Sequence, residues 1–154
     1  MTQSIRWESN WDLALAEARV QEKHVMLDVF NPGCGACKQM ESVTYPDRRT
    51  VDFINRFLIA PRVSTGSLDP VLGQFRIEYT PTIIILDGRA REHHRSVGFL
   101  PPEEFIPSLM LGIGRAWIDS GRPQKGMPML ERLVAEFPRS RSAAEAAGLR
   151  KRHV

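Results

Sequence analysis

The amino-acid sequence predicts an α/β fold, in which a central mixed sheet of four to five strands is flanked by helices and followed by a helical extension. Three observations support this prediction. The hydrophobic pattern gives the order β-α-β-α-β-β-α over residues 1–111. The motif Cys34-Gly35-Ala36-Cys37 follows an apolar run, at a strand-to-helix junction. The segment 82–86 is continuously apolar after its first residue, which is typical of a strand buried on both faces.

The first helix and strand follow from local signals. Asn10 can cap a helix that runs to about Glu22, because its side chain can accept a hydrogen bond from the first turn. Residues 24–30 are apolar and partly β-branched, which predicts a buried strand. A turn over 31–33 leads into a helix that opens at Cys34.

This second helix is expected to be interrupted. Pro46 ends or kinks it, because proline lacks the N–H group that a helix interior requires. Asp47 caps a continuation through Phe57. A second strand over 57–63 and a short helix over 67–76 are predicted to follow.

The second half of the sheet is predicted to be antiparallel. Asp87-Gly88 is a strong hairpin signal, and it joins the strand 82–86 to a strand near 92–97. Residues 101–104, Pro-Pro-Glu-Glu, then begin the last helix of the fold, because proline and acidic residues are favoured in a first turn.

Cys34 and Cys37 are the only cysteines of the chain. At the first turn of a helix, unpaired backbone N–H groups and the helix dipole stabilise a thiolate. Such a site can lower a cysteine pKa from ~8.5 into the range ~3.5–7.5. The thiolate can attack a disulfide, and the second cysteine can resolve the mixed disulfide. The pair therefore predicts dithiol/disulfide exchange.

Two other interpretations of the cysteine pair stay open. The cysteines could be structural, although buried structural cysteines rarely form C-x-x-C beside glycines after a strand. They could also bind a metal ion. Such a site usually needs four ligands, and because no second C-x-x-C is present, His93 and His94 would have to supply the other two. Adjacent residues of a strand point to opposite faces, which opposes this ligand set.

Three separated motifs resemble the thioredoxin superfamily. The segment 27–37 is similar to the family's strand and active-site motif, 79–82 (Tyr-Thr-Pro-Thr) to its cis-proline loop, and 96–99 (Ser-Val-Gly-Phe) to the segment whose glycine faces the active site. The resemblance covers about residues 5–111 and implies a thioredoxin fold. A subgroup pattern, most similar to the soluble thioredoxin-like domains of disulfide interchange proteins, comprises Met40-Glu41, the interrupted helix, Val51, Asn55 and Phe57.

The resemblance implies catalytic roles for Cys34, Cys37, Asp28 and Pro81. Cys34 is expected to be the nucleophile and Cys37 the resolving thiol. Asp28 stands where the family keeps a buried acid that exchanges the Cys37 proton, and burial raises the pKa of a carboxyl group. A hydrogen-bonded structural aspartate is the alternative for Asp28.

The resemblance implies that Pro81 follows a cis peptide bond, a form that an X-Pro bond tolerates at ~0.5–1 kcal/mol. That bond would turn the Thr80 backbone toward the cysteines, where an extended substrate could pair with it. An ordinary trans proline that starts a strand is the alternative. The substrate-binding residues implied by the motifs are Gly33, Gly35, Ala36, Thr80 and Gly98.

Two residues depart from the family pattern. Thioredoxins usually carry Trp before the first cysteine and Pro between the two, whereas this chain has Gly33 and Ala36. Loss of the tryptophan removes a flat apolar contact that partners use. We therefore expect a choice of partners unlike that of a general thioredoxin. Loss of the proline changes the relative stability of dithiol and disulfide, and we expect a cysteine pair that is less reducing than that of a general thioredoxin.

Composition limits the class of protein and its location. The 154 residues suit one domain with a short appendage, assigned here as 1–111 and 112–154. No apolar stretch approaches the ~20 residues of a membrane span, and the first residues do not resemble a signal peptide. We therefore expect a cytoplasmic protein without a membrane partner, and no metal or cofactor besides the Cys34–Cys37 disulfide.

The segment 112–154 exceeds what the fold needs and is basic. It carries nine Lys/Arg and four Asp/Glu, whereas 1–111 carry 12 and 14. A solvated helix face accounts for this charge better than a nucleic-acid site, because no aromatic platform accompanies it.

The pattern over 116–148 resembles part of a tetratricopeptide helix array, with Ser142 and Glu145 as a capping box. A single helical pair cannot form a solenoid. We therefore predict an extension packed on the first domain; the alternative is an arm that binds a protein partner or dimerises.

Two function classes follow. The first is a thiol–disulfide oxidoreductase that reduces protein disulfides, with a thioredoxin-reductase-type enzyme as a candidate electron donor. The alternative is a binding module or redox sensor that uses the helical tail to hold a partner. The intact C-x-x-C motif, Asp28 and Pro81 together favour the enzyme, because a binding module has no need for all three.

Overall fold

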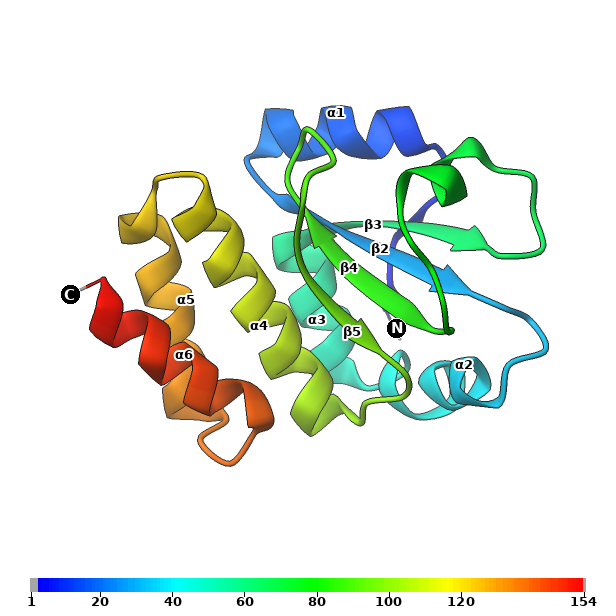
Figure 1. Cartoon of the computed structure of the whole chain (residues 1–154). Coiled ribbons are helices and arrows are strands. Elements are labelled where there is room, and N and C mark those ends of the chain that lie inside the picture. Colours follow the sequence, from blue (N-terminus) through cyan, green and yellow to red (C-terminus); the bar gives the residue numbers. More distant parts are fainter. Residues whose placement is uncertain (1–2, 154) are drawn as a thin grey trace.

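The computed structural model describes residues 3–153; residues 1–2 and 154, the outer ends of the two predicted domains, lie outside the described part. A five-stranded sheet has the order β1-β3-β2-β4-β5, with a group of three helices at one end of the molecule (Figure 1). The strands are β1 (Trp7–Glu8), β2 (His24–Phe30), β3 (Leu58–Ser64), β4 (Thr82–Leu86) and β5 (Glu92–Val97).

The helices lie on both faces of this sheet. They are α1 (Trp11–Gln21), α2 (Gly35–Gln39), α3 (Arg48–Phe57), α4 (Pro102–Asp119), α5 (Pro123–Glu136) and α6 (Arg141–Arg152). Two short helical segments complete the chain: the π-helix η1 (Met40–Thr44), which continues α2, and the 3₁₀-helix η2 (Pro70–Gln74). Sheet and helices together confirm the predicted α/β thioredoxin fold with its C-terminal helices.

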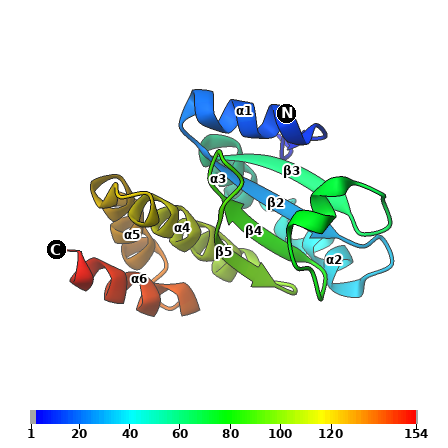
Figure 2. The same ribbon diagram turned by 45° about the horizontal axis from the view of Figure 1, so that its top comes forward.

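β2 is the central strand, paired with β3 in parallel and with β4 antiparallel. Its alternate side chains serve two separate cores. Val25, Leu27 and Val29 pack with α1 on one face, whereas Met26 belongs to the core built with α3 and α4 on the other. Figure 2 shows α1 and α4 on opposite sides of the sheet. Asp28 has the parity of Met26 and therefore points toward the α2–α4 side.

Most predicted elements are confirmed with small boundary shifts, and the Asn10 cap is present. Three details differ. The helix predicted over 67–76 is only the 3₁₀ turn η2, in which Val71 alone is buried, so little packing supports a longer helix. β1 was not predicted, because two residues show no periodicity. The capping box is wrong: α6 follows Ser140, and the Glu145 carboxylate binds Arg115 of α4 instead.

The helical extension is part of the same hydrophobic core as the sheet. α4 crosses the predicted boundary between 111 and 112 without interruption, and α5 and α6 pack against it. Leu130 and Leu133 of α5 are fully buried in the cluster that contains Met26 and Ile85. Packing of the extension on the first domain is thereby shown, whereas its resemblance to tetratricopeptide helices stays a prediction.

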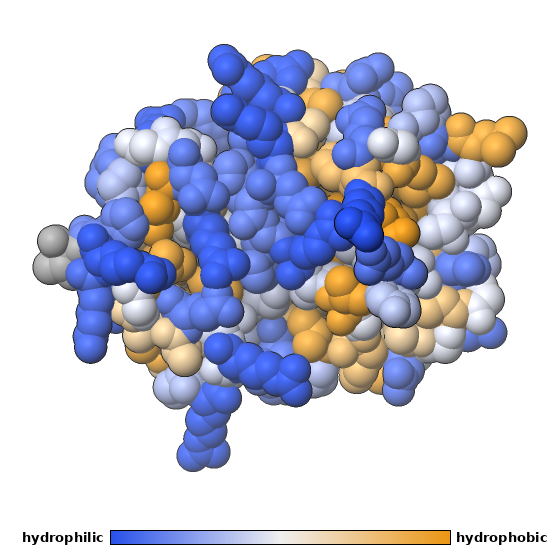
Figure 3. Space-filling model, in the orientation of Figure 1, coloured by the Kyte–Doolittle hydropathy of each residue, from blue (hydrophilic) through white to orange (hydrophobic). Residues whose placement is uncertain are grey.

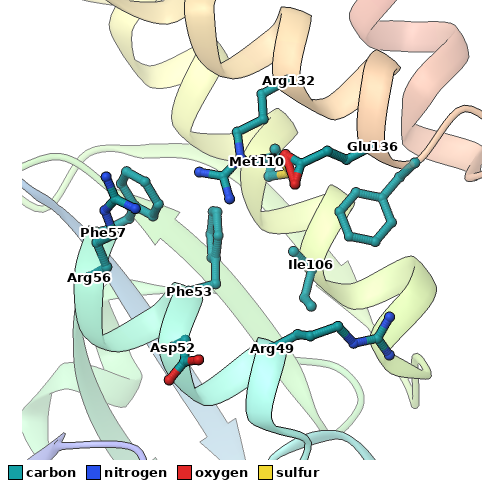
Figure 4. Close-up of a pocket in the computed structure, with 10 residues that line it drawn as sticks. Arg49, Asp52, Phe53, Arg56, Phe57, Ile106, Met110, Arg132 and Glu136 are labelled. Carbon is teal, nitrogen blue, oxygen red and sulfur yellow. Dashed lines mark hydrogen bonds and ion pairs between the residues drawn. The ribbon is translucent and has the colours of Figure 1, made fainter.

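A hollow of about 250 Å³ lies where α3 faces α4 and the end of α5 (Figure 4). Its floor is apolar and its rim is charged. The lining residues are Arg49, Asp52, Phe53, Arg56, Phe57, Ile106, Met110, Arg132, Glu136 and Phe137. Among the helices of residues 3–153, none has the length and apolar character needed to cross a membrane.

Two glycines set the close approach of α4 and α5. A Cβ atom at Gly126 would lie 2.8 Å from the backbone oxygen of Gly114, which cannot yield as a flexible side chain can. We expect Gly126→Ala to lower the free energy of unfolding by about 1–3 kcal/mol, as overpacking usually does. Urea unfolding followed by tryptophan fluorescence measures this change.

Gly148→Ala in α6 is the matched control. A Cβ atom at Gly148 meets no atom within 4 Å, and alanine is the better helix former by ~0.8–1 kcal/mol. This variant should therefore be as stable as the wild type or more stable. Equal unfolding midpoints for all three proteins would contradict tight packing between α4 and α5.

Candidate active site

Cys34 is the N-cap residue of α2 and has a free, partly exposed thiol. Its Sγ accepts the N–H of Cys37 at 3.2 Å and lies 3.2 Å from the carbonyl oxygen of Thr80. Partial burial opposes ionisation, yet hydrogen bonds from the Cys37 thiol, Thr80 and the backbone N–H groups of Ala36 and Cys37 lower the pKa of Cys34. The groups that donate to the sulfur favour a thiolate at Cys34, whereas the Thr80 carbonyl oxygen accepts the S–H of the protonated thiol.

Cys37 lies one helical turn further on and is only 5% exposed. Its thiol is also free. Burial, and then the interactions with Cys34, raise the pKa of Cys37 above its ordinary value. The two thiols are thus shifted in opposite directions, which separates a ready nucleophile from a thiol that needs a base.

The loop around Pro81 meets Cys34 from the other side of the site. The Thr80–Pro81 peptide bond is cis, and the Thr80 carbonyl oxygen reaches the Cys34 Sγ. The Pro81 carbonyl oxygen accepts the N–H of Gly98 at 2.9 Å. Gly98 has φ +90°, and no atom lies within 4 Å of the place of a Cβ atom there. Thr80 therefore lies beside the nucleophile, and Gly98 is joined to the same loop through Pro81.

The remaining residues expected to bind substrate surround Cys34 in the loop and first turn. Gly33 donates its N–H to the Asn31 Oδ1 at 3.0 Å, which shapes the turn before the nucleophile. Gly35 and Ala36 form the first turn of α2, and the space beside Gly35 is open. The substrate role of these residues stays a prediction.

Asp28 lies in the middle of β2 and is 1% exposed. Its Oδ2 accepts the Nε–H of Arg62 at 2.9 Å, and the two residues are in register between β2 and β3. Burial raises the pKa of Asp28 to about 6, although the charge of Arg62 acts in the opposite direction. A carboxyl with such a pKa can exchange a proton near neutral pH.

Arg62 is a site residue that the sequence did not single out. Its guanidinium binds Asp28 on one side and Glu41 of η1 on the other. The Arg62 Cζ also lies 4.2 Å from the ring centre of Phe30 and 4.7 Å from that of Trp7. The sequence signal for Arg62 was a single cation inside the otherwise apolar strand 58–63. The sequence could not identify Asp28 as its partner, because that pairing depends on the register of β2 and β3.

Two apolar side chains close to the site were also not predicted. Tyr79, just before Thr80, is 70% exposed, and Val97, just before Gly98, is 50% exposed. Figure 3 shows apolar residues on the half of the drawn face that holds α2 and the ends of β4 and β5, and further apolar residues over the C-terminal helices. A partner that approaches Cys34 would meet these side chains.

The alternative metal set is not assembled in the structure. His93 is bound through its ring nitrogens to Asp87 and Asp119, both at 2.9 Å. His94 contacts Ser108 and Arg115. Within residues 3–153, no three His, Cys, Asp or Glu side chains are arranged to hold a metal ion.

Most of the first predicted domain is similar in sequence to known proteins. The profile of the thioredoxin-like domain family matches residues 11–111. The thiol:disulfide interchange protein DsbD of Escherichia coli K12 is 33% identical over 101 residues, which are 62% of this chain and 18% of that protein. DsbD of Pseudoalteromonas atlantica is 31% identical over 101 residues, covering 62% of this chain and 17% of that protein. The chain thus spans less than a fifth of the length of these relatives.

Solved structures agree with the fold. A thioredoxin from Thermus thermophilus superposes with a TM-score of 0.66 at 24% identity, covering 77% of this chain and 95% of its own. A protein described as a putative disulphide-isomerase from Bacteroides thetaiotaomicron gives a TM-score of 0.61 at 24% identity, covering 71% and 92%. The cysteine pair, the cis-proline loop and the family match over 11–111 together place this chain in the thioredoxin-like domain family.

Proposed function

We propose that this protein is a thiol–disulfide oxidoreductase that reduces disulfides in protein substrates. The observation that carries the proposal is the geometry of two free thiols within one helical turn: Cys34 is partly exposed at the N-cap of α2 and accepts the N–H of the buried Cys37. The more exposed thiol, Cys34, has a lowered pKa, and the buried thiol, Cys37, has a raised pKa. Such a pair provides an attacking thiolate and a reserve thiol that ionises only when a base accepts its proton.

The first step is attack on the substrate. The Cys34 thiolate attacks one sulfur of the substrate disulfide and forms a mixed disulfide, and the other substrate sulfur leaves with the electron pair and takes up a proton. The carbonyl of Thr80 lies beside the reacting sulfur, where an extended substrate backbone could pair with it.

The second step releases the product. Cys37 gives its proton to the Asp28 carboxylate, and its sulfur attacks the Cys34 Sγ. The Cys34–Cys37 bond forms and the bond between Cys34 and the substrate breaks, with the electron pair leaving on the substrate sulfur. That sulfur takes up a proton. The substrate disulfide is thereby reduced to two thiols and the cysteine pair is oxidised to a disulfide.

The relatives support the chemistry at a coarser level than this proposal. The name of the DsbD proteins, thiol:disulfide interchange protein, states interchange and gives no direction. The reducing direction, a thioredoxin-reductase-type donor, a reducing compartment such as the cytoplasm and a protein partner of the C-terminal helices stay predictions. The scheme uses no cofactor besides the two cysteines.

A redox titration tests the direction of the reaction. The Cys34–Cys37 pair is equilibrated with glutathione and dithiothreitol buffers, and free thiols are counted by the mass shift on alkylation. Because the pair is expected to be less reducing than a general thioredoxin, we expect a midpoint between about −270 mV, the value of thioredoxin, and about −200 mV. A midpoint above about −200 mV would overturn the reducing direction and favour an oxidant or a sensor.

Single cysteine variants test the order of the two steps. Cys37→Ser should accumulate a covalent complex with a disulfide-containing protein such as insulin, because nothing resolves the mixed disulfide. Cys34→Ser should form no such complex at neutral pH, because the remaining thiol is buried and has a raised pKa. Non-reducing electrophoresis and mass spectrometry show the adduct. Faster trapping by Cys34→Ser than by Cys37→Ser would reverse the assignment.

Asp28→Asn should slow the second step and stabilise the fold. The folded pKa of Asp28, about 6, exceeds the ordinary aspartate value of 3.8, so the ionised carboxyl destabilises the folded state. Wild-type stability should fall as pH rises from about 4 to 6, and the variant should lack this loss. At pH 7–8 we expect the variant to be more stable by about 1–3 kcal/mol.

Urea unfolding across pH measures this stability difference, and quenched-flow alkylation measures the resolution of the mixed disulfide. A structural aspartate would show the stability change alone. If Asp28→Asn resolves the mixed disulfide at the wild-type rate throughout pH 5 to 9, Asp28 has no role in the reaction.

A further inference from the structure

Two buried oxygen atoms on residues that neighbour Arg62 have no hydrogen-bond partner in the described part of the chain. One is the Oδ1 of Asp28, whose Oδ2 binds Arg62, and the other is the hydroxyl oxygen of Tyr45. Native proteins leave few buried polar atoms unpaired, so a pair of them at one site needs an explanation. The proposed reaction uses Asp28 and assigns no role to Tyr45.

The chain holds the Tyr45 ring in one place. Tyr45 directly follows η1, and its N–H binds the Met40 carbonyl oxygen at 2.8 Å, an i to i+5 contact that belongs to the π-helical turn. The ring packs edge-on against Trp7 at 5.0 Å and Phe105 at 5.9 Å between ring centres. Only 6% of the residue is exposed. The aromatic contacts fix the ring without using the hydroxyl.

Tyr45 and Asp28 share Arg62 as a neighbour: the Arg62 Cζ lies 5.8 Å from the centre of the Tyr45 ring, and the Arg62 Nε–H binds the Asp28 Oδ2 at 2.9 Å. Burial, followed by the charge and the hydrogen-bonding influence of Asp28 and then by the charge of Cys37, raises the pKa of Tyr45 well above its ordinary value. The hydroxyl therefore keeps its proton at any pH where the enzyme would work, and it can only donate toward the carboxylate. Catalytic hydrogen bonds are often long in a resting structure and shorten when charge develops.

The other groups that face Asp28 set the background for this contact. Arg62 approaches from β3 and favours the ionised carboxyl, and Glu41 of η1 binds the far side of Arg62. Cys37 lies on α2. On the other side of the strand, the register partner of Asp28 in β4 is Ile83, which carries no charge. The Asp28 carboxylate thus has the Arg62 cation at Oδ2, and the neutral Tyr45 hydroxyl is available as a donor to Oδ1.

We propose that Tyr45 is a positioning residue for the proton transfer from Cys37, with its hydroxyl donating to the Asp28 Oδ1 whenever that carboxyl is ionised. This inference rests on the proposed function. Arg62 and Tyr45 together hold the carboxylate as a base, and Asp28 accepts the Cys37 proton as Cys37 attacks the Cys34 Sγ. No atom of Tyr45 is consumed or transferred in the step.

Tyr45→Phe removes the hydroxyl and keeps the ring contacts with Trp7 and Phe105. Without the donor, the midpoint of Asp28 titration should rise by about one pH unit. Carbon-13 NMR of the Asp28 carboxyl in the reduced protein measures this midpoint without any turnover. The pH profile for resolution of the mixed disulfide should move upward by the same amount, with about tenfold slower resolution below the midpoint and wild-type rates at high pH.

Thr50→Val is the matched control. The Thr50 hydroxyl on α3 is the third unpaired buried side-chain oxygen of the described chain, and it does not contribute to the pKa of Asp28. This variant should leave both the titration and the pH profile unchanged. An equal shift in Thr50→Val would show a general effect of removing a buried hydroxyl and would overturn the assignment.

The double variant Asp28→Asn, Tyr45→Phe tests whether Tyr45 acts through Asp28. In the Asp28→Asn background, Tyr45→Phe should cause no further slowing of resolution. A further slowing would mean that Tyr45 acts independently of Asp28, and an unshifted carboxyl titration in Tyr45→Phe would also overturn the inference. A shifted titration in a protein that does not reduce disulfides would instead leave the Tyr45 contact standing and refute the proposed function.

Discussion

The burial of a carboxyl group in the central strand is the constraint on which the site depends. Asp28 is 1% exposed, and its charged form is costly in such a place unless it is paired. Arg62 supplies the pairing at 2.9 Å, and it does so only because β3 lies beside β2 in the observed register. A one-residue shift of β3 would direct the Arg62 side chain to the opposite face of the sheet. The position of the base therefore depends on the pairing of two strands that are distant in sequence.

The groups around Asp28 also join the outer part of the sheet to the active-site helix. The guanidinium of Arg62 stacks near Trp7 of β1 and Phe30 of β2 and binds Glu41 of η1. An arginine suits this place because its planar group can pair with carboxylates and stack on aromatic rings simultaneously. The same cluster that holds the base thus holds the turn that follows Cys37, which keeps the thiol and the base in a fixed relation.

The C-terminal helices belong to the fold rather than to a separate unit. α4 is both the last helix of the thioredoxin-like domain and the first helix of the extension, and Leu130 and Leu133 contribute to the central core. Arg115 of α4 binds Glu145 of α6 and contacts His94 of β5, so a polar link adds to the apolar one. Removal of the extension would expose part of this core, and loss of activity in a truncated protein would not by itself reveal a partner.

The sequence by itself determined the elements and the attacking residues, because these depend on signals close together in the chain. Periodicity, caps and the C-x-x-C spacing were sufficient for β2, α1, α3 and the hairpin, and for Cys34 at a helix start. The motif Tyr79–Thr82 was sufficient to expect the proline loop. Arg62, Tyr45 and the shared core of the extension could not be predicted in this way. Their roles arise from contacts between segments far apart in sequence, where strand register and side-chain packing decide which groups meet, and no local pattern records that choice.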